Sequence, residues 1–178
     1  PDAEVQSEYN FSVVATDAAG NESAAQAVSL SINNLDEVSP TITSGDTAVA
    51  IDENSGAGQV IYTATADDSA DTSDGVTFSL AEGSDAALSI DASTGAVTLN
   101  TDPDFEAQSE YNFSVVATDA AGNASSQAVS MDINNLDEVA PSITSDDAVT
   151  IEEATGAGQV IYTATADDSA DTSDGVSF

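Results

Sequence analysis

The chain has 178 residues, of which 33 are aspartate or glutamate and none is lysine, arginine or histidine, so every ionised side chain is negative. This repulsion opposes compaction unless cations from solution bind the chain or screen its charge, and it argues against a nucleic-acid or anionic-membrane partner. An apolar fraction of 40% nevertheless favours a folded chain over a disordered one.

A long repeat organises the chain. The segment 7–21, SEYNFSVVATDAAGN, recurs unchanged at 109–123. A period of about 100 residues is that of a whole domain rather than of one solenoid turn. With boundaries at the linker-like NNLDEVSP and NNLDEVAP, we expect the C-terminal part of a repeat at 1–37, a complete repeat at 38–138 and the N-terminal part of a repeat at 139–178. We therefore expect a window from a longer array, or ends completed by neighbouring copies.

Alternating apolar and polar residues between glycine-containing turns predict strands in the complete repeat. In chain order they lie near 48–51, 59–66, 76–80, 87–90, 96–100, 110–118 and 127–133. The alternation places Val60, Tyr62 and Ala64 on a buried face, and likewise Tyr111 and Phe113. Seven short strands in one repeat predict an all-β, Greek-key β-sandwich, and the tandem repeat predicts such domains joined end to end.

The carboxylates gather at turns and linkers rather than along the strands. Glu53, Asp104 and Asp119 lie at or near predicted strand ends, and each linker carries an Asp-Glu pair. Strand ends lie at the poles of a sandwich, so two adjacent poles can supply the six to eight oxygen ligands that calcium prefers. The absence of cysteine and histidine also leaves hard, oxygen-preferring cations as the metals that fit.

The order of these motifs resembles the cadherin repeat across the complete unit. Residues 51–54 (IDEN) resemble the early glutamate motif, 64–68 (ATADD) the DxD segment, and 104–106 (DFE) the DxE motif. Residues 117–119 (ATD) resemble the late aspartate motif, and 135–141 (NLDEVAP) the inter-repeat linker in its bacterial style. The resemblance implies a β-sandwich with calcium at each junction between repeats.

The resemblance also implies a ligand set for each junction. The set at the first junction is Asp2, Glu4, Asn34, Asp36, Glu37, Asp68, Asp74 and Asp119. The set at the second junction is Glu53, Asp104, Glu106, Asn135, Asp137, Glu138, Asp168 and Asp174. Asn135 and Ala66 stand where the family has aspartates, which leaves the number of ions at each junction open.

The acidic composition is also compatible with two other interpretations. Acidic residues without lysine are also typical of adaptation to high salt, and for Glu110 and Asp132 on the strand faces we favour a hydrated surface over metal binding. Without histidine, cysteine or lysine the chain lacks the usual nucleophile pairs and Schiff-base chemistry, so we expect no enzyme. A paired-carboxylate glycosidase would also lack its aromatic platform, because the chain contains no tryptophan.

Together these features predict a calcium-rigidified extender repeat of a large bacterial adhesin or surface filament, secreted and located at the cell surface. An adhesive module that recognises another copy or a glycan, and a subunit of an extracellular filament, stay open as alternatives. The expected partners are neighbouring repeats of the same or adjacent chains and a cell-surface or glycan ligand. No apolar run approaches the roughly 18 residues of a membrane span, so no membrane insertion is expected.

Overall fold

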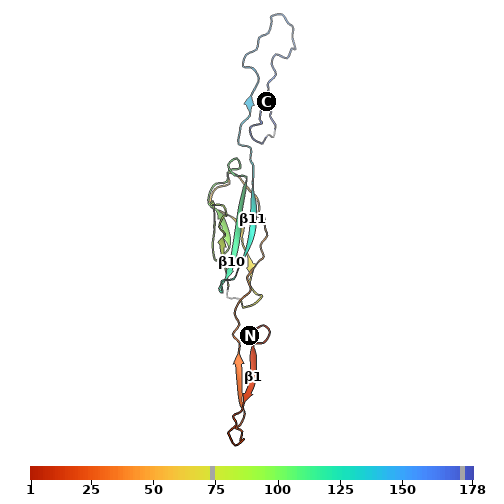
Figure 1. Cartoon of the computed structure of the whole chain (residues 1–178). Helices are drawn as coiled ribbons and strands as arrows, with labels where there is room; N and C mark the ends of the chain where they lie inside the picture. The colour runs from red at the N-terminus through yellow and green to blue at the C-terminus, as the bar shows by residue number, and fades with distance from the viewer. Residues whose placement is uncertain (73–74, 173–174) are drawn as a thin grey trace.

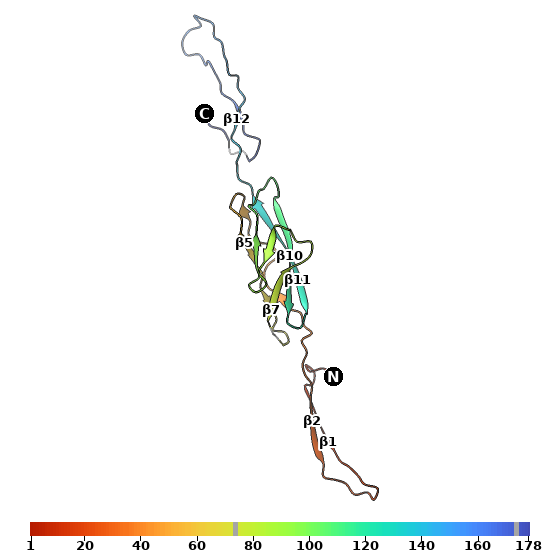
Figure 2. The same ribbon diagram turned by 90° about the vertical axis from the view of Figure 1, so that its left-hand side faces the viewer.

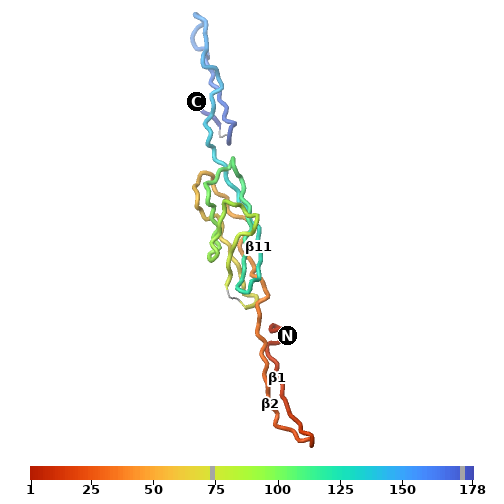
Figure 3. The backbone as a smooth tube through the Cα atoms, turned by 60° about the vertical axis from the view of Figure 1, so that its left-hand side comes forward, coloured from red at the N-terminus to blue at the C-terminus, as the bar shows by residue number. Residues whose placement is uncertain are grey.

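The computed structural model describes residues 1–72, 75–172 and 175–178. The chain forms an extended rod in which three segments follow one another end to end (Figures 1–3). All regular elements of the described residues are β-strands, and no helix there is long and apolar enough to cross a membrane. We refer to residues 1–37 as the first segment, 38–138 as the central unit and 139–178 as the third segment.

The central unit is a sandwich of two facing layers. One sheet has the strand order β4-β11-β10-β7, and the opposite layer contains the sheet β5-β9-β8 and the pair β3-β6. The strands are β3 (Thr41–Ile42), β4 (Ile51–Asp52), β5 (Gln59–Thr63), β6 (Ala66–Asp67), β7 (Val76–Leu80), β8 (Leu88–Ile90), β9 (Ala96–Leu99), β10 (Glu110–Asp119) and β11 (Ala124–Asn134). This arrangement confirms the predicted all-β sandwich fold.

The core lies between the two layers and follows the period-two pattern of β10 and β11. Tyr111, Phe113 and Val115 alternate with exposed or half-buried residues, and all three are at most 4% exposed. They pack with Leu99 of β9 and Met131 of β11, both 0% exposed. Burial of these side chains is the main stabilising term for the sandwich.

The first segment contains the same antiparallel strand pair, but without the opposite layer that packs on β10 and β11 in the central unit. Strands β1 (Glu8–Val13) and β2 (Gln26–Ser31) pair antiparallel, with Phe11 opposite Val28 as Phe113 is opposite Val129. Phe11 is 51% exposed, whereas Phe113 is 3% exposed. The local sequence therefore sets the hairpin, and the strands of residues 41–99 supply the burial in the central unit.

The third segment repeats the beginning of the central unit. Strands β12 (Ser142–Ile143) and β13 (Ala166–Asp167) pair antiparallel, as β3 and β6 do. The Thr144 and Thr165 hydroxyls lie 3.0 Å apart, and the Thr43 and Thr65 hydroxyls lie 2.8 Å apart. The corresponding threonine pairs thus form the same contact in both places.

The prediction for β5 was wrong at Val60, which is 60% exposed. The register between β5 and β9 shifts between Val60 and Tyr62, and the bulge turns Ile61 into the core at 8% exposure. Tyr62 still packs on the core, with its ring edge-on to Phe113 at a centroid distance of 5.6 Å. A bulge inserts one residue and so resets the alternation on which the prediction depended.

Strand β4 pairs in parallel with the end of β11, at Ile51 opposite Ile133. The pairing extends toward the start of the unit. The backbone N–H of Ser130 donates to the carbonyl oxygen of Asp46 at 3.1 Å, and the carbonyl oxygen of Ser130 accepts from Ala48 N at 2.9 Å. The segment 46–52 therefore covers the edge of β11, which protects it from pairing with another chain.

Candidate metal centre

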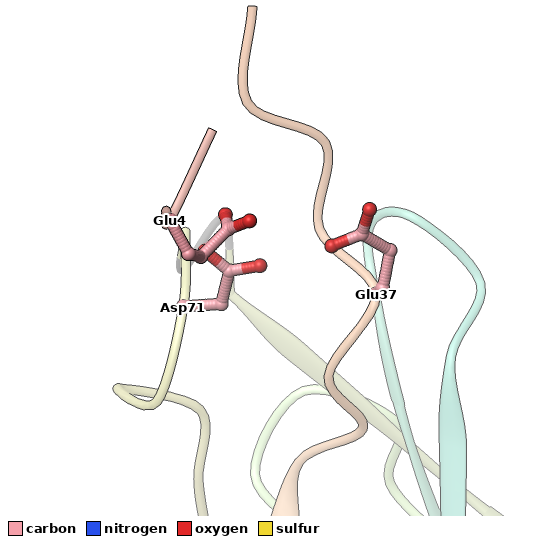
Figure 4. A group of neighbouring side chains, drawn as sticks. All are labelled: Glu4, Glu37 and Asp71. Atoms are coloured by element: carbon pink, nitrogen blue, oxygen red, sulfur yellow. The ribbon is translucent and has the colours of Figure 1, made fainter. Parts of the chain in front are cut away.

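The first junction, where the linker 33–40 joins the first segment to the central unit, contains two groups of carboxylates. In one group Glu4, Glu37 and Asp71 each place an oxygen within 4.8 Å of the others (Figure 4). The side-chain amide of Asn34 donates to Asp71 Oδ1 at 2.7 Å. Asp71 Oδ2 is buried and has no hydrogen-bond partner among the described residues, so it is an acceptor available to a cation.

The second group at this junction joins Asp36 of the linker to Asp68 and Asp119 of the central unit, again with oxygens within 4.8 Å of one another. Asp68 is 9% exposed and Asp119 is 6% exposed. Burial raises the pKa of Asp119, but hydrogen bonds from Asn123 and from Gly122 N outweigh this effect and lower it below its ordinary value. Asp119 is therefore held as an anion beside two further carboxylates.

The second junction, along the linker 134–141, is organised around Glu53. This side chain is 1% exposed, and it lies with Asp104 and Glu106 in a third group whose oxygens are within 4.8 Å of one another. Glu53 Oε2 accepts from Phe105 N at 2.9 Å and Oε1 accepts from Leu136 N at 2.6 Å. One buried carboxylate thus fixes both the DxE segment and the linker.

The linker and the third segment meet the same group. Asn54 donates through its side-chain amide to Glu138 Oε1, and Glu138 N donates to Asp171 Oδ2 at 3.0 Å. Within the part of the chain that the structure describes, Asn135 Oδ1 is buried without a hydrogen-bond partner, so this junction also has an unsatisfied acceptor. Residues of the central unit, the linker and the third segment therefore converge here.

Mutual repulsion is strong at both junctions. Desolvation, followed by the charges of Glu53 and Glu106, raises the pKa of Glu138. Desolvation, followed by the charges of Glu4 and Asp71, likewise raises the pKa of Glu37. A bound divalent cation would remove this penalty, and the sequence offers no basic side chain that could do so.

The structure brings most of the predicted ligand residues to the junctions but not all of them into one of the three groups. Asp2 Oδ1 accepts from Glu4 N at 3.1 Å, and Asp137 Oδ1 accepts from Val139 N at 3.2 Å, so both cap their own backbone. Asp168 is half-buried and belongs to none of the three groups found among the described residues. Asp74 and Asp174 lie outside the described residues.

Asp71 and Asp171 were missed by the sequence prediction. It assigned the ligand role to Asp74 and Asp174, which precede a glycine as the corresponding family residue does. The structure places Asp71 in a carboxylate group and joins Asp171 to the second linker. The signal that could have found them is their equal spacing, since each lies three residues after Asp68 or Asp168.

Comparison with protein families addresses the central unit directly. The profile of the cadherin domain matches residues 47–134. The central unit contains a cadherin domain. A profile of the bacterial Ig-like domain, a second β-sandwich family, matches residues 1–34. The two profiles therefore cover identical segments, because residues 7–21 and 109–123 have the same sequence. Both families are typical of extracellular surface proteins. Cadherin repeats are non-enzymatic adhesion domains that typically bind calcium between repeats, which agrees with the expectation of no enzyme.

Solved cadherin ectodomains share the architecture of the whole chain. The "Protocadherin gammaB7 EC3-6 cis-dimer structure" superposes with a TM-score of 0.63 at 18% identity, covering 97% of this chain and 46% of that one. Mouse cadherin-23 EC22-24 gives 0.63 at 23% identity, covering 94% and 56%, and the human desmocollin-1 ectodomain gives 0.55 at 17%, covering 94% and 33%. The chain thus spans between 33% and 56% of these three chains. No curated protein sequence matches it.

Proposed function

We propose that the chain is a calcium-stiffened extender segment of a bacterial extracellular adhesin or surface filament. The observation that carries the proposal is the gathering of carboxylates at both linkers without any basic side chain to neutralise them. Carboxylates of successive segments form the groups at the first linker, and at the second linker the Glu53 group lies beside the hydrogen bond between Glu138 and Asp171 of the third segment. The match of residues 1–34 to a bacterial Ig-like domain supports the bacterial assignment.

The residues present fit calcium. The buried acceptors Asp71 Oδ2 and Asn135 Oδ1 lack hydrogen-bond partners within residues 1–72, 75–172 and 175–178, and each group offers carboxylate oxygens, the ligand type that calcium takes. At the first junction Glu4, Glu37 and Asp71 would hold a cation, and Asp36, Asp68 and Asp119 would hold another. At the second junction the candidates are Glu53, Asp104, Glu106, Asn135, Asp137, Glu138, Asp168, Asp171 and, outside the described residues, Asp174.

Binding at these positions would couple metal affinity to stiffness. When bound, the cation supplies positive charge that attracts carboxylates on both sides of a linker. Without it, those carboxylates repel one another and favour bending of the linker, because the electrostatic free energy of like charges falls as they move apart. The rod-like arrangement would therefore be the form selected by calcium (Figure 2).

Calorimetric titration of the chain with calcium tests the proposal. Replacing Asp104 by Asn together with Glu106 by Gln should weaken binding by at least about tenfold, since metal-site substitutions have effects of this order. The same pair should lower the melting temperature only when calcium is present, because a ligand stabilises the state it binds. The matched control is Glu110→Gln with Asp132→Asn, which removes the same charge from a strand face and should leave calcium binding unchanged.

Equal weakening by both pairs would show a diffuse charge effect and would favour adaptation to high salt. The shape of the molecule gives an independent check through small-angle scattering. Arrays of two, four and six repeats in calcium should increase in maximum dimension by nearly equal steps, with smaller steps and a broader distribution in chelator. Compact arrays in calcium would contradict the extender role and favour an interaction surface between units.

A further inference from the structure

Asn123 connects the central unit to the preceding linker. Its side-chain Nδ2 donates to Asp119 Oδ2 at 2.9 Å and to the backbone carbonyl oxygen of Asp36 at 2.9 Å. A primary amide carries two N–H groups, so one side chain can serve both acceptors. The half-buried Asn123 therefore contacts a candidate ligand of the unit and the backbone of a candidate ligand in the linker.

The turn that holds Asn123 forms from its own sequence. In the first segment Asp17 accepts from Asn21 Nδ2 at 2.8 Å and from Asn21 N at 2.8 Å. Asp119 accepts from Asn123 Nδ2 at 2.9 Å and from Asn123 N at 2.8 Å. The identical DAAGN turn at 17–21 thus holds the Asn21 side-chain amide in the same way, although no linker contact of Asn21 is described there. The turn therefore orients the asparagine amide without help from a linker.

A second donor holds the other end of the same stretch of linker. The hydroxyl of Ser125, at the start of β11, donates to the carbonyl oxygen of Pro40, which is itself buried. Asn123 and Ser125 therefore attach the linker at Asp36 and at Pro40. None of these hydrogen bonds requires a cation.

We propose that Asn123 is a positioning residue that docks the preceding linker on the cadherin domain and so sets the spacing of the Asp36, Asp68 and Asp119 carboxylates. The link to metal affinity rests on the proposed calcium function of that group. The docking itself stands on the hydrogen bonds alone. Docking before metal binding lowers the entropy lost when the cation is bound, which raises affinity at the first junction.

Hydrogen–deuterium exchange of the whole chain tests the proposal, because the peptides of the two linkers differ in sequence and report separately. In chelator, Asn123→Ala should speed exchange across residues 33–41. In a calcium titration, the midpoint of protection at this linker should rise about tenfold, as for other groups that orient metal ligands, while the second linker is unchanged. Asp119 keeps its bonds from the backbone N–H groups of residues 122 and 123, so the turn is retained.

Asn21→Ala is the matched control, since it removes the same turn hydrogen bond and should alter neither linker. Ser125→Ala provides a second variant that does not touch the turn and should also speed exchange at 33–41. Unchanged exchange there in Asn123→Ala, or the same change in Asn21→Ala, would overturn the docking role while leaving calcium binding intact. If calcium does not change exchange in the wild-type chain, the proposed calcium function is refuted. Faster exchange at residues 33–41 in Asn123→Ala, but not in Asn21→Ala, would still support docking.

Discussion

The contrast between Phe113 and Phe11 gives a sharp test of what stabilises the cadherin domain. Both residues lie in the same fifteen-residue sequence, yet Phe113 is 3% exposed and Phe11 is 51% exposed. Truncating a buried phenylalanine costs about 3–5 kcal/mol through lost transfer free energy and the cavity that remains. The edge-to-face contact of Phe113 with Tyr62 is lost as well. Phe113→Ala should therefore remove a large part of a stability that is typically about 5–15 kcal/mol.

Urea unfolding followed by circular dichroism, in constant calcium, measures this change. For a domain of this size, 1 kcal/mol corresponds to about 4–8 °C in melting temperature, so thermal unfolding of Phe113→Ala should show a decrease of roughly 12–40 °C. Phe11→Ala, with identical neighbours, should leave the transition of the central unit within about 0.5 kcal/mol. A loss below about 1 kcal/mol for Phe113→Ala, or equal losses for the two variants, would refute the assignment of the core.

Two further predictions concern turns of the central unit. Gly95 has φ +71, and a Cβ there would lie 2.4 Å from the backbone carbonyl oxygen of Ala64, whereas Gly83 has φ +89 with open space around it. In urea unfolding, Gly95→Ala should therefore lower the free energy of unfolding by about 2–4 kcal/mol and Gly83→Ala by about 1 kcal/mol. Equal losses for the two variants would contradict the packing described. Hydrogen bonds from the Ser93 hydroxyl, then from the N–H groups of Thr94 and Ser93, lower the pKa of Asp91 from 3.8 to about 2. The stability that this carboxylate adds is present above about pH 3.8 and is lost as the pH falls through about 2, so the urea midpoints of wild type and Asp91→Asn should differ at neutral pH and converge near pH 2; a difference independent of pH would count against the assignment.

The fold was largely predictable because the strand pattern is local. The alternation in β10 and β11 identified the buried face correctly at Tyr111 and Phe113, and the glycine turns separated the strands. The bulge between Val60 and Tyr62 was not predictable, because Val60, Ile61 and Tyr62 are all apolar or aromatic and alternation cannot show which of them is inserted. The short strand β3 was missed for a related reason, since two residues cannot show a period.

The sequence predicted which junction most of the acidic residues belong to, but not which of their carboxylates lie together. The acidic residues of the DxE segment and of the linkers are placed by strand ends, so the junction to which they belong follows from the order of strands. Asp71 lies in a loop, where position depends on backbone turns that the sequence pattern does not encode. Asn34 Nδ2 donates to Asp71 Oδ1 across the junction at 2.7 Å, and the two residues are 37 positions apart in the chain.

The parallel pairing of the segment 46–52 with β11 determines how the domain would respond to tension. The chain enters the unit at one pole and leaves at the other (Figure 1). A pull along the rod therefore draws this entering segment and the departing end of β11 in opposite directions along their own axes. The hydrogen bonds at Asp46, Ala48, Ser130 and Asn134 are then loaded in shear and must fail together rather than one after another. A force along the rod would thus meet the resistance of the whole ladder at once.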